Sequence, residues 1–454
     1  MNLKLIGPAI GGASVGGFGP MLSLGILAAL TPGDVRVTIA DEHVEPIDFE
    51  EQVDLVGIST LTPTAPRAYA IADRFRRKGV PVVLGGVHPT FMPDEAGLHA
   101  DAVCIGEAEG YWGQVVDDFK AGALKRVYQP PQRPNPVIVP VARRELFSKS
   151  GYIIRKTLLA TRGCPFNCSF CSIIRQYGGG FRQRPIEDVV AEVQSLRRRG
   201  PVAFVDDNIV GDPKWAKRLF RALVPTRIRW VGQGSITLAE DDSLLELAAR
   251  SGCIGMYIGL ESVQQGSLDE VNKYANQVER FEGAIKKIQS RGIIIHGGFI
   301  FGMDTDDESA FERTVRFAQR VKLESASFGI LTPFPGTPLY ERLDREGRIL
   351  DRDWEHYDIA HVVFEPKLMS ARALREGQVW AMKEFYSVSS MFQRLNFFRI
   401  EFPFIALLNL AHRRVARDLD RSLQEDSSGR ESSRVGHAGW GGRFDWDGAH
   451  RVGP

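Results

Sequence analysis

A chain of 454 residues, of which 43% are hydrophobic and 25% charged, has the composition of a folded protein with two or three domains. Its 57 basic residues balance 56 acidic residues, so no basic excess points to nucleic acid. No apolar run reaches the roughly 18 to 20 residues of a membrane span, and the glycine-broken N-terminus lacks a signal-peptide pattern. With five cysteines, three of them in one stretch, a secreted disulfide framework is not expected, and a cytoplasmic protein is predicted.

Residues 2–128 alternate strand and helix patterns, which predicts a doubly wound α/β domain with a parallel sheet. The expected strands are residues 3–10, 35–41, 53–60, 81–86 and 101–109, and the expected helices are 21–30, 65–79 and 111–122. In such sheets ligands bind at the carboxyl ends of the strands. Cys104 and Cys253 lie in apolar, strand-like surroundings and are interpreted as core residues.

Small and polar residues gather at three of these strand ends, in the sequences GISTLT, LGGVHPT and IGEAE. The combination resembles the cobalamin-binding domain that precedes many radical S-adenosylmethionine (SAM) enzymes. The resemblance implies cobalamin contacts from Ser59, Thr60, Thr62, Gly85, Gly86, His88, Gly106 and Glu107. Glycines there would let the backbone approach a large flat ligand and its nucleotide tail. The alternative is that they only form turns after strands.

One feature departs from the pattern of classical cobalamin domains, which carry Asp-x-His-x-x-Gly after the first strand and use its histidine as the lower cobalt ligand. The corresponding loop, residues 11–20, contains no histidine. Asp41 and His43 spell Asp-x-His, but after the second strand and without the glycine. We therefore expect cobalamin without a histidine on its lower face. His43 is expected in a surface loop, and His88 in a turn near the ligand tail rather than on a metal.

Residues 129–155 are proline-rich and basic at their start, which predicts an extended connection packed across the cleft between two domains. The stretch TRGCPFNCSFCS follows at residues 161–172 and places Cys164, Cys168 and Cys171 in a C-x3-C-x2-C pattern. Three thiolates in one loop can ligate three irons of a [4Fe–4S] cluster and leave the fourth iron without a protein ligand. A structural zinc site normally takes four ligands in paired spacings, and no matching second pair follows.

The cysteine spacing resembles the signature of the radical SAM superfamily. The resemblance implies that SAM chelates the open iron and that an electron from the cluster breaks a carbon–sulfur bond, giving a 5′-deoxyadenosyl radical. It also implies an external electron donor of the flavodoxin or ferredoxin type. Phe166 and Phe170 lie between the cysteines, where they would shield the cluster from water, and Phe170 is a candidate SAM contact.

From residue 156 to about residue 350, six strands are each followed by a helix, which fits the partial (β/α)6 barrel of the radical SAM family. The resemblance implies SAM contacts at the strand ends. Asp206, Asp207 and Asn208 would receive the amino group, although they also fit a helix N-cap. Glu261 would contact the ribose or the amino group, and Gly298 the adenine. Gln233 and Ser235 end the third strand and complete the candidate set.

Residues 351–420 resemble the helical C-terminal extension of the anaerobic ring-cyclase and hopanoid-methylase branch. The aromatic residues and histidine that either line a substrate cavity or form core are Trp354, Tyr357, His361, Trp380 and Tyr386. Residues 396–417 are apolar and then basic, which fits a helix on a membrane surface or one packed on the barrel. Residues 421–454 lack periodicity and are expected to be a disordered tail.

The resemblance to cobalamin-binding radical SAM proteins covers residues 1 to about 400 and implies a cobalamin-dependent radical SAM enzyme. Because methyl transfer is the most frequent reaction of that class, we expect a C-methyltransferase acting on an unactivated carbon of a lipid or natural product. A non-methylating radical enzyme, which would catalyse oxidative cyclisation or rearrangement, is the main alternative. An iron–sulfur electron carrier or a zinc-binding module is an alternative from another class. No catalytic residue beyond the cluster ligands is identified, and the protein supplies placement while the cofactors carry the chemistry.

Overall fold

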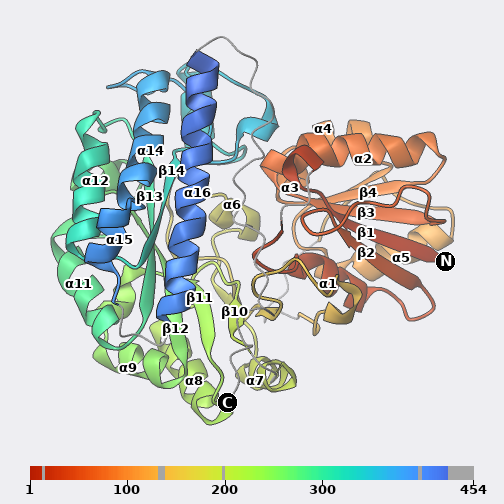
Figure 1. Ribbon diagram of the computed structural model, residues 1–454. Helices are drawn as coiled ribbons and strands as arrows, with labels where there is room; N and C mark the ends of the chain where they lie inside the picture. The colour runs from red at the N-terminus through yellow and green to blue at the C-terminus, as the bar shows by residue number, and fades with distance from the viewer. Residues whose placement is uncertain (13–15, 131–138, 197–199, 397–400, 428–454) are drawn as a thin grey trace.

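The computed structural model describes residues 1–12, 16–130, 139–196, 200–396 and 401–427. These residues form two six-stranded parallel sheets in neighbouring lobes, and long C-terminal helices pack on the second lobe (Figure 1). The expected fold class is confirmed: a Rossmann-like domain precedes a partial barrel, and a helical extension follows. Among the described residues, none of the helices is both long enough and apolar enough to cross a bilayer.

The first sheet has the strand order β2-β1-β3-β4-β5-β6. Its strands are β1 (Asn2–Gly7), β2 (Arg36–Asp41), β3 (Leu55–Thr60), β4 (Val82–Gly86), β5 (Ala102–Cys104) and β6 (Val127–Tyr128). The apolar runs of β1 and β3 are buried on both faces, as a parallel sheet covered by helices requires. Because the strand order reverses beside β1, ligands of this kind of sheet are expected at its carboxyl edge.

Helices cover both faces of this sheet. They are α1 (Leu22–Leu30), α2 (Ala65–Arg77), α3 (Val87–Phe91), α4 (Pro93–His99) and α5 (Trp112–Lys120). α1 and α5 share one core cluster, and α2 and α4 share the other. Three of the observed elements, β6, α3 and α4, were not predicted. The fifth strand was predicted to reach residue 109, whereas it stops at Cys104 because the chain turns at Gly106, where φ is +74°.

The second sheet has the order β14-β13-β12-β11-β10-β7, and its edge strands β7 and β14 leave the barrel open on one side. Its strands are β7 (Thr157–Leu158), β10 (Val202–Phe204), β11 (Trp230–Gly234), β12 (Cys253–Glu261), β13 (Ile294–Phe301) and β14 (Ser325–Ile330). The helices after them are α7 (Ile186–Ser195), α8 (Pro213–Leu223), α9 (Asp242–Arg250), α10 (Gln265–Glu270), α11 (Val278–Ser290), α12 (Ser309–Arg320) and α13 (Pro338–Arg345). These six parallel strands confirm the predicted partial barrel.

A small insertion stands between the two lobes. It consists of the antiparallel hairpin β8 (Thr161–Arg162) and β9 (Arg182–Gln183), with the cysteine loop and helix α6 (Ile173–Tyr177) between its strands. The connection before it packs on the first lobe where it is described. Phe147 and Tyr152 are buried there, and the Tyr152 hydroxyl donates to Asp41 Oδ2 at 2.9 Å. Residues 131–138 of the expected linker lie outside the described residues.

The C-terminal extension consists of α14 (Ala371–Phe385), α15 (Val388–Arg394) and α16 (Phe402–Ser427). Tyr386 is fully buried, and its hydroxyl donates to the Ala326 carbonyl of β14 at 2.5 Å, which fastens the end of α14 to the barrel edge. α16 continues seven residues beyond the expected start of the disordered tail, so that prediction is wrong for residues 421–427. Residues 428–454 lie outside the described part of the chain.

Candidate functional site

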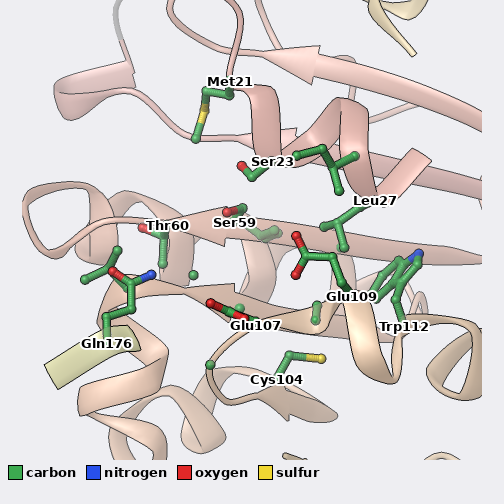
Figure 2. Close-up of a pocket in the computed structure, with 18 of the residues that line it drawn as sticks. Met21, Ser23, Leu27, Ser59, Thr60, Cys104, Glu107, Glu109, Trp112 and Gln176 are labelled. Carbon is green, nitrogen blue, oxygen red and sulfur yellow. The ribbon is translucent and has the colours of Figure 1, made fainter. Parts of the chain in front are cut away.

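A cavity of about 280 Å³ lies at the carboxyl ends of β3, β4 and β5 (Figure 2). α1 forms one wall, and Arg162 of β8 with Gln176 and Tyr177 of α6 forms the opposite wall. Six of the eight predicted cobalamin residues line it: Ser59, Thr60, Gly85, Gly86, Gly106 and Glu107. The structure therefore brings together residues from three separate strand ends, as the parallel sheet predicts.

Small residues keep this cavity open. A Cβ atom at Gly85 would lie 3.3 Å from Cys104 Cβ, and one at Gly57 would lie 3.3 Å from the Trp112 ring. Gly86 has φ of +104°, and a Cβ there would meet the Thr60 carbonyl oxygen at 2.5 Å, so only glycine fits this turn. The lining combines apolar side chains with the hydroxyl groups of Ser59 and Thr60 and with charged groups, which suits a flat heteroaromatic group with polar edges.

The other two predicted cobalamin residues, Thr62 and His88, do not line the cavity. His88 is fully buried. Its imidazole lies 3.4 Å from the Glu95 carboxylate and packs edge-on against Trp354. Burial lowers the pKa of His88, so the ring is neutral at physiological pH. This residue serves the contact between the first lobe and the C-terminal region, and its place near a ligand tail stays a prediction.

The cavity walls also include residues that the sequence analysis did not single out. Cys104 was assigned to the core, and it is buried, but it also lines the cavity, where burial raises its pKa to about 12 and keeps the thiol neutral. Leu27 and Trp112 contribute the apolar sides (Figure 2). Apolar residues on the inner face of a helix look the same in sequence whether they fill a core or border a cavity, so no signal could have distinguished them.

The cysteine loop lies beside this cavity, between β8 and α6. Cys168 is 6% exposed, and Cys164 and Cys171 are half-buried. Burial raises the pKa of Cys168 and raises that of Cys171 to about 12, while the cation of Lys273 acts in the opposite direction on both thiols. Among the described residues no three His, Cys, Asp or Glu side chains converge on a single metal ion. A cubane cluster instead takes each thiolate on a different iron.

The three polar residues at the end of β10 support this loop. Asp206 accepts hydrogen bonds from the Ala160 amide at 3.1 Å and from the Thr161 hydroxyl at 2.6 Å. Asp207 accepts from the Gly163 amide at 3.0 Å, and the Asn208 amide lies 3.8 Å from the sulfur of Cys164. Burial raises the pKa of Asp206 to about 7. These side chains hold the loop that carries the cysteines.

The end of β12 provides a second charged group near the cysteines. Glu261 has φ of +65°, which is uncommon for a residue with a side chain, and its carboxylate pairs with Lys273 Nζ at 2.9 Å. Asn276 donates to the carbonyls of Gly259 and Leu260, both at 3.0 Å, and so fixes the same strand end. Glu261 was predicted from the sequence, but Lys273 and Asn276 were not, because they lie in a loop between α10 and α11 that matches no motif.

Comparison with known proteins gives a family for each of the two lobes that hold these sites. Residues 8–115 match the B12 binding domain, residues 158–318 match the radical SAM superfamily, and residues 337–403 match a domain of unknown function, DUF4070. The bacteriochlorophyllide d C-12(1)-methyltransferase of Chlorobaculum tepidum is 35% identical over 82% of this chain and 84% of that protein. The chain belongs to the cobalamin-binding radical SAM family. The C-8(2)-methyltransferase of the same organism is 32% identical over 80% and 86%.

Solved structures of other radical SAM proteins share the fold of this family member. TsrM from Kitasatospora setae, determined with cobalamin and a [4Fe–4S] cluster, aligns with a TM-score of 0.66 at 17% identity and covers 94% of this chain and 99% of its own. OxsB, determined with aqua-cobalamin, aligns with a TM-score of 0.69 at 15% identity, over 95% and 74%. At these identities the likeness concerns the fold alone.

The cofactors of this radical SAM protein are a [4Fe–4S] cluster, SAM and cobalamin, and its residues fit them. Three cysteines in one loop supply the thiolate donors of the cluster. The cavity at the sheet edge combines apolar walls with hydroxyl and charged groups, which suits the heteroaromatic and polar parts of the nucleotide tail of cobalamin. No histidine is among the described residues of its wall, and the expected absence of a histidine on the lower cobalt face stays a prediction. His43 instead lies in a half-exposed loop beside Asp41, at 2.9 Å.

The remaining predicted SAM residues lie on or after strands of the barrel and, for Phe170, in the cysteine loop. Gln233 is exposed and donates to the Asp207 carbonyl at 3.2 Å, and Ser235 is buried beside Thr237. A Cβ atom at Gly298 would collide with the Tyr257 hydroxyl, so glycine permits this close approach. Phe170 packs on the barrel core. Their roles in SAM binding stay predictions.

The Gly85→Leu protein is expected to lose cobalamin. The added side chain would occupy the cavity, and we expect cobalamin affinity to fall at least about 100-fold, because a filled cavity excludes the ligand. Gly113→Leu on α5 is the matched control, since an atom added at Gly113 meets open space. Absorbance titration of each protein with cobalamin checks this. Equal affinity of the two variants would place the cobalamin elsewhere.

Proposed function

We propose that this protein transfers a methyl group from SAM to an unactivated carbon atom, and that the acceptor is a tetrapyrrole macrocycle. The observation that carries the proposal is the likeness, at 35% and 32% identity over at least four fifths of each chain, to two proteins named as bacteriochlorophyllide d methyltransferases. Relatives named as a hopanoid methylase and as anaerobic cyclases are less similar, at 26%. The electron carrier and zinc-module alternatives are set aside by the family membership.

When bound, the cofactors supply radical formation and carriage of the methyl group. The chain's own residues place them and exclude water. Asp206, Asp207 and Asn208 fix the cysteine loop from one side, and Lys273 with Glu261 provides a cation and a carboxylate beside it. This pair matches the opposite charges of the amino and carboxylate groups of SAM. An external flavodoxin or ferredoxin would deliver the electrons that the cluster needs.

The proposal is tested with methyl-labelled SAM. The protein, reconstituted anaerobically with cluster and cobalamin and supplied with a reductant, is incubated with bacteriochlorophyllide d. We expect the label in the tetrapyrrole, together with S-adenosylhomocysteine and 5′-deoxyadenosine. 5′-Deoxyadenosine with an altered but unlabelled tetrapyrrole would favour oxidative ring formation. If the label appeared in a hopanoid and not in the tetrapyrrole, the substrate would be a lipid.

α16 supports a further proposal, a peripheral contact with an anionic membrane. Its exposed positions follow helical spacing on one face, with Leu407 and Leu410 in the first half and Arg414, Arg417 and Arg421 in the second. Such an apolar and then basic face fits the boundary between acyl chains and anionic headgroups. A membrane would also hold a hydrophobic tetrapyrrole close to the protein.

We expect the full chain to sediment with phosphatidylglycerol vesicles and less with phosphatidylcholine vesicles, and added salt should weaken the binding. Leu407→Ser with Leu410→Ser should reduce vesicle binding at least about tenfold, because apolar area is lost from the contact. Leu98→Ser is the control, because Leu98 is an exposed leucine of the first lobe. Equal binding of all three proteins, or no binding by the unmodified chain, would end this proposal.

A further inference from the structure

Four charged side chains meet in the interior between the first sheet and the cysteine loop. Glu107 and Glu109 follow β5, and Arg162 and Arg182 face each other across the β8–β9 hairpin. Arg182 Nη1 donates to Glu107 Oε2 at 2.8 Å, and its other terminal nitrogen bonds the second oxygen of the same carboxylate. Arg162 bonds Glu109 and lies 3.7 Å from Glu107. All four side chains are less than 10% exposed.

The burial of these charges has a physical cost. Taking an ion out of water costs several kcal/mol, and the attraction between partners repays this only when their geometry is good. A buried ion pair is therefore weak evidence for stability. What such a pair does provide is a fixed relative orientation of its two partners. The planar guanidinium of Arg182 bonds both carboxylate oxygens of Glu107, and this geometry allows one orientation. A hydrophobic contact of the same size would allow sliding.

The position of the four residues shows what this orientation controls. Glu107, Glu109 and Arg162 line the cavity, and Arg162 also lies two residues before Cys164. Arg182 does not line the cavity but contacts two residues that do: it bonds Glu107, and its guanidinium lies 5.9 Å from the centre of the Tyr177 ring. The ion network thus joins the wall of one cofactor site to the strand that carries the ligands of the other.

We propose that Glu107, Glu109, Arg162 and Arg182 form an interdomain clamp that positions the cobalamin domain over the cluster loop. Arg182 is a positioning residue that acts through Glu107. Glutamate oxygens held by arginine keep a constant place in the cavity wall, so cobalamin binds at a fixed distance from the cysteines. The clamp rests on membership of the cobalamin-binding radical SAM family and does not depend on methyl transfer or on the identity of the acceptor.

The test compares Arg182→Gln, Glu107→Gln and the double variant in the full chain. Each single change leaves one buried charge without its main partner, so both should lower the melting temperature and weaken cobalamin binding about tenfold or more. The double variant removes both charges. We expect its melting temperature to recover, while its dissociation constant for cobalamin stays as weak as that of either single variant. Absorbance titration and thermal unfolding give the two readouts, and iron content confirms that the cluster is loaded.

Glu246→Gln is the matched control, because Glu246 forms an exposed ion pair with Arg291 on the barrel surface, and both readouts should keep their unmodified values. Wild-type cobalamin affinity in Arg182→Gln would overturn the clamp. So would a double variant whose affinity recovers with its melting temperature, since the network would then be structural alone. A double variant that loses the product of the two single effects would show that Arg182 does not act through Glu107. The double variant contains no unpaired charge of this pair and should therefore fold. If a single variant fails to fold, the cobalamin affinity of the double variant, compared with that of the unmodified chain, still tests the clamp.

Discussion

We expect the Cys168→Ala protein to hold no [4Fe–4S] cluster and to cleave no SAM. Two thiolates remain after the change, which is one fewer than the signature supplies for three irons. The loop itself should keep its shape, because backbone hydrogen bonds fix it at Ser169, which donates to the Val271 carbonyl and accepts from the Leu339 amide, both at 3.0 Å. Turnover should fall at least about a thousandfold, since the electron source for SAM cleavage is lost. Iron and sulfide content and the electron paramagnetic resonance spectrum measure the cluster.

Cys253→Ala is the matched control for this change. Cys253 is also buried and also loses one sulfur atom, but it lies at the start of β12 in the barrel core. Its loss should cost about 1 kcal/mol of stability, an ordinary value for a small core truncation, and should leave cluster content unchanged. A Cys168→Ala protein that retains full iron and sulfide, or a Cys253→Ala protein that loses them, would contradict the assignment of the three ligands.

The elements that hold the two sites could be predicted because they follow local rules. Apolar runs such as that of β3 are typical of strands buried on both faces, and the residues after them must lie at one edge of a parallel sheet. Ser59, Gly85 and Glu107 therefore meet in one cavity although they come from three strands. The cluster ligands could be predicted for the same reason, since three cysteines within one short loop need no long-range contact to come close.

Contacts between distant residues could not be predicted. Glu107 and Arg182 are 75 positions apart, and although Glu107 was predicted near cobalamin, nothing in the sequence pairs its carboxylate with Arg182. His88 was expected near a ligand, yet Trp354 of the C-terminal region packs against it. The sequence also could not decide which aromatic residues and histidine of the C-terminal region form core. These residues are Trp354, Tyr357, His361, Trp380 and Tyr386. Tyr357 and Tyr386 are core residues, and Trp380 and His361 keep more than a third of their side chains exposed.

Lys273 is a second residue whose place near the cysteines only the structure shows. We expect its removal to change both the affinity for SAM and the reduction potential of the cluster. Its ammonium group lies 2.9 Å from Glu261 and acts electrostatically on Cys168 and Cys171. In Lys273→Met the buried carboxylate of Glu261 loses its cation, a change that costs about 3 to 5 kcal/mol in buried pairs. We expect SAM affinity to fall at least about 100-fold, because the site would hold an unbalanced negative charge.

The same change should lower the reduction potential of the cluster, since a nearby positive charge favours the reduced, more negative state. Potentiometric titration followed by electron paramagnetic resonance measures this without turnover, and SAM added to the reduced protein gives the affinity. Glu261→Gln with Lys273→Met should regain thermal stability, because no buried charge is left unpaired, but not SAM affinity. Lys286→Met removes an exposed ammonium group that pairs with Glu282 at 2.7 Å, and should alter neither quantity. An unchanged potential and SAM affinity in Lys273→Met would show that this lysine serves only to hold the end of β12.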